Sequence, residues 1–315
     1  MRYFDIILTD SSGKALDRWR SHDDNMNAKP NAIKVEINAP ITLLSQADNN
    51  TSVIVYGLEL SRLRQSYNPV DSKIEVYGGM GKGLPFAKPE QAGLLFRGDV
   101  FSVYPVYSRG MVAVKFDIRP SLKTPRAEGG NFIFKWDKGM QLSTAIKNMF
   151  PDFAVTANVS PQLTTNFNML SRFVTTQDFA RWLKQYTQAF KISNKYTGVD
   201  FHFENNALIF DDHTGTTSDK PKEILITDFI GQPTWQGLQS VDCRVCMRGD
   251  LKITDKVKLP ELLASAYNQQ IIAQKVRETL SFKGEWTVQG LTHLGDSRGG
   301  SADSWVTILN LLKYA

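Results

Sequence analysis

Alternation of apolar and polar positions dominates the first third of the chain. From Ile33 to Asn38, aliphatic side chains alternate with polar ones, which is the period-two pattern of a strand with one buried face. Turns rich in glycine, proline and serine separate this run from others of the same kind. Strands at this length and spacing favour a barrel or a sandwich. The pattern predicts further strands over 2–9, 52–56, 73–77, 94–104 and 111–118, and a short helix at Leu58, Leu60, Leu63 and Arg64.

A helical period replaces this alternation in the middle of the chain. One apolar face is formed, at helical spacing, by Phe179, Trp182, Leu183, Tyr186 and Phe190. The helix is predicted to begin near Thr176, because a hydroxyl and early acidic residues satisfy free N–H groups there. The same segment contains a predicted strand at 132–136, a helix at 142–150 and a hairpin at 199–210 that turns at Asn205-Asn206. The middle of the chain is therefore predicted to be α+β.

Strand patterns return after a polar stretch over 211–222. They predict strands at 224–226, 238–247, 251–259, 278–294 and 305–312, with a helix from Glu261 to about Gln274 between them. The order along the chain is therefore β, then α+β, then β.

Composition and charge narrow the class of protein. The 315 residues include 37 Lys and Arg against 32 Asp and Glu, so the formal net charge is 37 − 32 = +5. With 42% apolar and 22% charged residues, a disordered or collagen-like chain is excluded. No uncharged apolar run approaches the roughly 18 residues of a membrane-spanning helix. The positive charge is spread evenly along the chain, so sequence-specific nucleic-acid binding is not expected.

The N-terminus and the cysteines bear on the compartment. Asp5 interrupts the only early apolar run, so a secretory signal peptide is not expected. Two cysteines cannot form a disulfide framework and indicate synthesis in a reducing cytoplasm. Cys243 and Cys246 have the spacing of half a zinc or redox motif, but no second ligand pair exists. Residues three apart on a strand point to opposite faces, so we expect Cys243 beside Val245 in the core and Cys246 turned away.

The stretch from Gly78 to Gly83 invites comparison with phosphate-binding loops. A Walker loop needs a glycine where this chain has Val76 and a hydroxyl where it has Gly83. The glycine spacing of dinucleotide-binding loops needs a third glycine where this chain has Leu84. We therefore predict a loop that leaves a strand and binds no phosphate.

The four histidines do not form a catalytic set. His22 and His213 lie beside aspartates in polar stretches, and we interpret both as solvated loop residues. His202 and Glu204 share one strand face, so the pair could do acid–base chemistry. A pair that lies on the surface without a catalytic role is the simpler interpretation. We predict no catalytic, cofactor-binding or metal-binding residue.

The C-terminal block is the most distinctive part of the chain. The strand from Gly284 to Val288, which contains Trp286, is followed by a turn with His293, Gly295 and Asp296 and by a return strand that begins at Trp305. This succession resembles the end of tailed-phage baseplate hub proteins, such as the Mu-like hub. Other segments are similar to the same family, namely Asn31–Ile37, Ile74–Met80, Gly93–Gly98 and Gly231–Trp235.

The resemblance implies a fold and a role. The implied fold is α+β, mainly β, with two tail-tube-like β-barrels, over 1–120 and 216–315, and an α+β insertion domain between them over 121–215. The implied role is that of a structural baseplate hub, a homotrimer whose six barrels surround a DNA channel. The implied partners are the tail tube protein, the central spike protein, other baseplate proteins and DNA that passes without sequence specificity. No membrane span is expected. The implied location is the baseplate of the virion tail, assembled in the host cytoplasm.

Two other classes of function stay open at this point. A tail-associated cell-wall hydrolase would use Glu204 with Asp211 or Asp212 as its carboxylates. A secreted carbohydrate-binding β-protein would need a signal peptide. The barrels and the insertion account for the whole length, so we predict a purely structural part that is not an enzyme. Trp286 and Trp305 are expected in the core, because both lie in alternating strands.

Overall fold

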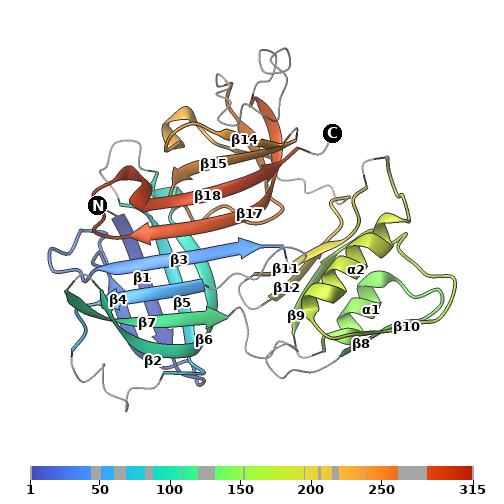
Figure 1. The fold of residues 1–315 in the computed structure, drawn as a ribbon, viewed down its shortest axis with the longest axis horizontal. Coiled ribbons are helices and arrows are strands. Elements are labelled where there is room, and N and C mark those ends of the chain that lie inside the picture. The colour runs from blue at the N-terminus through green and yellow to red at the C-terminus, as the bar shows by residue number, and fades with distance from the viewer. Residues whose placement is uncertain are drawn as a thin grey trace. The chain divides into compact units, whose positions relative to one another are not determined.

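The chain divides into two compact units in the computed structural model (Figure 1). The first unit comprises Met1–Ile41, Asn49–Arg119 and Lys220–Ala315, and the second comprises Thr42–Asp48 and Pro120–Asp219. The structure describes residues 2–43, 51–59, 69–81, 88–108, 110–119, 132–151, 153–194, 196–204, 207–214, 220–237, 239–261 and 282–313.

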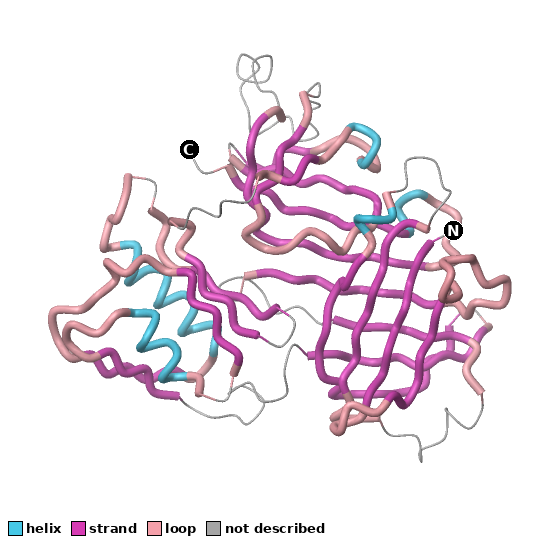
Figure 2. Tube along the Cα trace, turned by 180° about the vertical axis from the view of Figure 1, so that it is seen from behind, coloured by secondary structure: helices cyan, strands magenta, loops and turns pink. Residues whose placement is uncertain are grey.

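Strands dominate the first unit (Figure 2). They form one sheet of thirteen strands along the path β14-β15-β18-β17-β3-β4-β7-β6-β5-β1-β2, and β16 pairs with both β17 and β13. The N-terminal segment supplies β1 (Arg2–Thr9), β2 (Ala15–Arg20), β3 (Val35–Thr42), β4 (Thr51–Tyr56), β5 (Lys73–Met80), β6 (Gly93–Ser108) and β7 (Met111–Arg119). The C-terminal segment supplies β13 (Lys222–Glu223), β14 (Thr234–Gly237), β15 (Ser240–Cys246), β16 (Lys256–Leu259), β17 (Gly284–Asp296) and β18 (Trp305–Leu312).

Strands β3 and β17 join the two β segments of the first unit. Immediately after β17, the backbone N–H of Ser297 donates to the carbonyl of Val35 at 2.9 Å, and Ser297 Oγ accepts from the N–H of Val35 at 3.0 Å. β3 is paired with β4 on its other side, so its backbone polar groups are used on both edges. Two segments 262 residues apart in sequence are therefore neighbours in one sheet. We call this junction the β3–β17 seam.

The core of the first unit draws on both β segments. In β3, Val35 and Ile37 are buried whereas Asn38 is exposed, as the period-two pattern predicts. Met247 and Trp305, from the C-terminal segment, belong to the same buried cluster as these N-terminal residues. The first unit is therefore held together by a shared sheet and a shared core.

The second unit combines two helices with two small sheets. Helix α2 (Thr176–Gln188) begins where Thr175 Oγ1 accepts a hydrogen bond from the N–H of Asp178, which satisfies a free donor of the first turn. The other elements are α1 (Leu142–Met149), the pair β8 (Phe132–Trp136) and β10 (Met169–Phe173), and the sheet β11 (Asp200–Glu204), β12 (Ala207–Asp211) and β9 (Ala154–Asn158). The core is rich in aromatic side chains, including Phe134, Trp136, Phe150, Phe173, Phe179, Phe201 and Phe210.

The predicted fold class, α+β and mainly β, is confirmed. The hairpin at 199–210 is confirmed by the antiparallel pairing of β11 and β12. Among the described strands, the path of the large sheet is open, since no register pairs β14 with β2. The closure of two barrels and the domain limits at 1–120, 121–215 and 216–315 therefore stay predictions.

Some local predictions differ from the structure. A strand at 224–226 is wrong, because a 3-10 turn begins at Ile226 and Asp228 Oδ2 closes it by accepting from the N–H of Leu225. The strand predicted at 251–259 is confined to β16, because the chain turns at Thr254, whose φ is +71°. Strands β2, β9, β10, β13 and β14 were not predicted from the alternation of apolar and polar residues. The helices predicted at 58–64 and 261–274 lie mostly outside the described residues.

Candidate functional site

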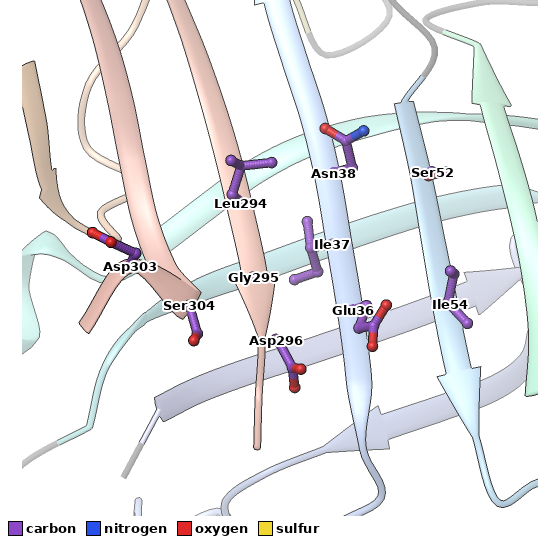
Figure 3. Close-up of a pocket in the computed structure, with 10 residues that line it drawn as sticks. All are labelled: Glu36, Ile37, Asn38, Ser52, Ile54, Leu294, Gly295, Asp296, Asp303 and Ser304. Atoms are coloured by element: carbon purple, nitrogen blue, oxygen red, sulfur yellow. The ribbon is translucent and has the colours of Figure 1, made fainter. Parts of the chain in front are cut away.

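A pocket of about 400 Å³ opens on the large sheet beside the β3–β17 seam (Figure 3). Strands β3 and β4 form one wall, and β17 with the 3-10 turn Ala302–Ser304 forms the other. Binding pockets in proteins begin at about 300 Å³, so this volume accommodates one long side chain or a small molecule. The lining residues are Glu36, Ile37, Asn38, Ser52, Ile54, Leu294, Gly295, Asp296, Asp303 and Ser304.

Strand alternation places the polar side chains at this pocket. Successive side chains of a strand point to opposite faces, so Glu36 and Asn38 reach the pocket while Val35 lies in the core. On β17 the same alternation brings Leu294 and Asp296 to the pocket. The carboxylates of Glu36 and Asp296 thus meet across the seam, although they are far apart in sequence (Figure 3).

Lys34 bridges these two carboxylates. Its Nζ lies 2.7 Å from Glu36 Oε1 and 3.2 Å from Asp296 Oδ2, and only 10% of its side chain is exposed. Tyr56 Oη donates to the same Glu36 oxygen at 3.0 Å, and Lys34 Nζ lies 4.6 Å from the centre of the Tyr56 ring. Burial lowers the pKa of Lys34, but its hydrogen bonds to Glu36 and Asp296 raise it, and the net change is upward. Lys34 therefore stays charged and ties β3 to β17.

Other polar groups of the lining are less engaged. Asp303 Oδ1 lies 3.8 Å from Arg244 Nη1, and both side chains are more than half exposed. Ser52 lines the pocket and is nine-tenths buried. The lining as a whole contains three carboxylates and no cationic side chain. Because Glu36 and Asp296 already share Lys34, Asp303 is the carboxylate of this lining that has no described cation closer than 3.8 Å.

The pocket differs from a metal site. Within the described ranges, no three His, Cys, Asp or Glu side chains are grouped so that they could hold a metal ion. No residue of this pocket stands out in the amino-acid sequence as functional. Its only signal was the outward polar position of residues such as Glu36 and Asn38, which is typical of any solvent-facing strand.

The carboxylates of the hydrolase hypothesis are not brought together. In the β11–β12 hairpin, Asp211 pairs with Asp200 whereas Glu204 pairs with Ala207 at the opposite end. Asp200, the residue opposite Asp211, lies four residues before Glu204 on β11. Four residues of a strand span about 13 Å. Paired catalytic carboxylates of glycosidases lie about 5–9.5 Å apart. Asp212 is engaged elsewhere, because its Oδ2 accepts from the N–H of Ser160 at 2.6 Å.

The histidines are more buried than predicted. His22 is 4% exposed and its Nδ1 lies 2.7 Å from Ser21 Oγ, so the solvated-loop interpretation is wrong there, and burial lowers the pKa of His22. His213 is also largely buried, with Nε2 3.6 Å from Asp200 Oδ2 and Nδ1 3.4 Å from Asp211 Oδ1. His202 is 1% exposed, so it is not a surface residue, although its Nε2 does lie 3.6 Å from Glu204 Oε2.

The two cysteines and the two tryptophans are placed as predicted. Cys243 is buried beside Val245 in β15 while Cys246 is only half-buried, and both thiols are free. Burial raises the pKa of Cys243 to about 12. Trp286 and Trp305 are 1% and 2% exposed, which confirms their core positions. Of the glycine-rich stretch, residues 78–80 end β5 and residues 82–87 lie outside the described part of the chain.

No helix in the described ranges is both long enough and apolar enough to cross a membrane.

Comparison with known proteins identifies the fold. No family model and no curated protein matches this chain. Among solved structures, the 43 kDa tail protein of prophage MuSo2 from Shewanella oneidensis is similar with a TM-score of 0.53 and 9% identity, over 98% of this chain and 96% of that one. A tail protein from Neisseria meningitidis MC58 is similar with a TM-score of 0.51 and 11% identity, again over 98% and 96%. A chain of the Francisella PdpA-VgrG complex has a TM-score of 0.50 and 10% identity, over 100% of this chain and 58% of that one. This chain therefore has the fold of these tail proteins over almost its whole length, as the resemblance of its motifs implied.

Proposed function

We propose that this chain is a structural baseplate hub of a bacteriophage tail. In this role three copies form a ring that joins the six-fold tail tube to the three-fold central spike and surrounds part of the DNA channel. The observation that carries the proposal is the single sheet that unites two β segments across the seam, in a fold shared with tail proteins over 98% of the chain. Two β segments in each of three copies give six β segments, one for each position of a six-fold tube.

The ends of the sheet favour assembly with other chains. Among the described strands, β14 and β2 end the path of the large sheet and pair on one side only. Open strand edges aggregate unless they are covered, and a closed ring of subunits covers them. Exposed apolar side chains add contact surface: Tyr107, Met111 and Val112 at the β6–β7 hairpin, and Ile133, Leu170 and Val174 on and beside the β8–β10 pair.

The expected partners follow from this role. One structural neighbour is a chain of a two-protein assembly, PdpA-VgrG, which supports a role in a complex with spike-type proteins. We propose that the tail tube protein, the central spike protein and other baseplate proteins contact this chain. DNA passes through the ring without being read, because the net charge of +5 is spread along the chain. The location is the tail of the virion, after assembly in the host cytoplasm.

The proposed role is not enzymatic. A tail-associated hydrolase is the alternative, and the separation of Glu204 from Asp211 argues against its carboxylate pair. Peptidoglycan release by the purified full chain, compared with Glu204→Gln, tests this point. We expect no release from either protein, whereas release by the unmodified protein that is lost in Glu204→Gln would favour the hydrolase.

Solution mass tests the hub. The full chain is measured by light scattering alone and after mixing with the tail tube protein and the spike protein of the same phage. We expect this chain to form a trimer either alone or after a partner protein is added. A chain that stays monomeric with both partners would overturn the proposal.

A further inference from the structure

We propose that the outer face of the β8–β10 pair binds a segment of a partner protein that carries both acidic and aliphatic side chains. The attribution of that partner to the phage tail rests on the proposed function, whereas the chemistry of the face follows from this chain alone. We define the outer face by its exposed residues, Ile133, Lys135, Leu170, Arg172 and Val174.

Strand alternation separates the two faces of the pair. Phe134 of β8 and Phe173 of β10 turn inward, and their ring centres lie 5.3 and 5.2 Å from that of Phe179 in α2. Ile133 and Arg172 are directly opposite each other in the register, and both are exposed. Since successive side chains of a strand point to opposite faces, the pair is buried on its α2 side and exposed on the other.

Three aliphatic side chains are neighbours on the outer face. Ile133, Leu170 and Val174 are 58%, 71% and 67% exposed. Ile133 is opposite Arg172, and Leu170 and Val174 lie two residues before and after that arginine, so both are diagonal neighbours of Ile133. Diagonal neighbours on an antiparallel pair lie about 7–8 Å apart, within reach of long side chains. Single exposed aliphatic residues are ordinary, but a contiguous group of them marks an interaction site.

Two cations accompany the aliphatic side chains, and the outer face contains no Asp or Glu. Arg172 is exposed and forms no ion pair with a described residue. Lys135 Nζ lies 3.0 Å from Asp137 Oδ2, but 68% of the lysine side chain and 36% of the aspartate side chain are exposed. Exposed pairs of this kind are weak, so Lys135 can exchange its partner. A protein that covers the aliphatic side chains must supply carboxylates, because it otherwise buries two cations without partners.

Other occupants fit the outer face less well. A second copy of this chain docked face to face would bring the cations of the two copies together, and like charges across an interface are repulsive. Lipid-binding basic segments carry about 4–8 Lys and Arg residues, whereas the outer face has two. Proteins that bind single-stranded nucleic acid stack bases on aromatic side chains, which the outer face lacks. The mixture of aliphatic and basic side chains therefore matches a protein segment in which aliphatic and acidic residues are mixed.

Peptide binding to the full-length chain tests the proposal. The probe is N-acetyl-Ser-Glu-Ile-Glu-Leu-Glu-Ser-amide, and the matched control has Gln in place of each Glu, which keeps the length and the aliphatic side chains. We expect saturable binding of the acidic peptide by calorimetry. The Gln peptide should bind more weakly by about tenfold or more, because charge-assisted hydrogen bonds to Lys135 and Arg172 are lost. Equal affinity of the two peptides, or no saturation by the acidic peptide up to about 10 mM, would overturn the proposal.

Substitutions on the outer face locate the binding site. Arg172→Gln should weaken binding of the acidic peptide about tenfold, and Leu170→Ser should weaken it about fivefold through lost apolar contact. Lys147→Gln is the control, because it removes an exposed cation of α1 that is not part of the outer face. All three positions are exposed, so the temperature of thermal unfolding should stay unchanged and show that each variant is folded. Undiminished affinity in folded Arg172→Gln or Leu170→Ser, or an equal loss in Lys147→Gln, contradicts the proposal.

A vesicle measurement separates a protein partner from a lipid surface. The probe is vesicles made from an equimolar mixture of phosphatidylserine and phosphatidylcholine, and we expect that the full chain does not sediment with them. Sedimentation that is lost in Arg172→Gln and Leu170→Ser would assign the outer face to a membrane and overturn the proposal. These measurements use the chain alone, whereas the solution mass tests the hub, so the outer face and the hub can fail separately.

Discussion

The indole Nε1 of Trp305 donates a hydrogen bond of 2.9 Å to the backbone carbonyl of Gly79, 226 residues earlier in the chain. The ring of Trp305 also fills the space beside Gly295, where an added Cβ would lie 2.6 Å from Trp305 Cζ3. A side chain at Gly79 would collide with Ala92 at 2.6 Å. The absence of a side chain at Gly295 thus makes room for the ring of Trp305, which connects the two β segments of the first unit.

Trp305→Phe should destabilise the fold. The substitution leaves the carbonyl of Gly79 without its buried donor, which costs about 1–3 kcal/mol. Urea unfolding measures the loss. Trp235→Phe is the control, because Nε1 of Trp235 has no hydrogen-bond partner among the described residues and the ring is equally a core ring. Losses of the same size in both variants would show that ring size, and not the bond to Gly79, accounts for the effect.

Lys34→Met should weaken the seam. The change leaves the carboxylates of Glu36 and Asp296 facing each other without their shared cation. We expect the free energy of unfolding to fall by about 1–3 kcal/mol, because partly buried carboxylates lose a charged partner. Lys258→Met is the control: Lys258 and Glu223 are both more than half exposed and 3.6 Å apart, and such pairs contribute about 0–1 kcal/mol. Equal stability of Lys34→Met and the unmodified chain would show that Lys34 does not stabilise the β3–β17 seam.

Acid should destabilise the fold partly through His293. Burial lowers the pKa of His293 to about 3, whereas an unfolded histidine titrates near pH 6.5. The unfolded chain therefore takes up this proton first, so the contribution of His293 is complete above about pH 6.5. It is lost as the pH falls toward 3, by about 1.4 kcal/mol for each pH unit.

Urea unfolding at pH 7, 6 and 5 checks this expectation. His293→Gln keeps a polar group beside Thr307, whose Oγ1 lies 3.0 Å from His293 Nδ1, but it removes the titration. The stability of this variant should fall less steeply with acid than that of the unmodified chain. Identical slopes would mean that His293 does not contribute.

The β8–β10 pair should serve assembly and not folding. Leu170 and Val174 are 71% and 67% exposed, so the double change to serine should alter the free energy of unfolding by no more than about 0.5 kcal/mol. It should nevertheless weaken association with tail partners, because exposed apolar side chains contribute contact area. Sedimentation with partner proteins measures this effect. Lys147→Ser, which alters an exposed position of α1 in the same unit, is the control. If the double variant associates as well as the unmodified chain, this surface does not contribute to assembly.

Most of the correct predictions came from the alternation of apolar and polar residues along the chain. In β3, Val35 and Ile37 are buried and Asn38 is exposed, as the period-two pattern predicts, because strand geometry alone sends successive side chains to opposite faces. The apolar stripe of α2 followed from the helical period in the same way, whereas the capping hydroxyl is that of Thr175, one residue before the predicted Thr176. Predictions failed where a long-range contact overrode local pattern, as at Thr254, whose N–H donates to the carbonyl of Val288.

The candidate pocket could not be predicted at all. Glu36 and Asp296 are each ordinary outward residues of alternating strands, and nothing near either one in sequence indicates the other. His22 was misjudged for a related reason, since the burial of a polar loop residue depends on the segments that fold over it.

The amino-acid sequence by itself determined the succession of strands and helices and which face of each strand is apolar, because these depend on neighbours a few residues away. Only the tertiary structure decided that β3 and β17 share an edge, that Trp305 reaches Gly79, and that three carboxylates surround one pocket. The physical reason is that strand pairing uses identical backbone groups at every residue, so the choice of partner is settled by the packing of the whole core.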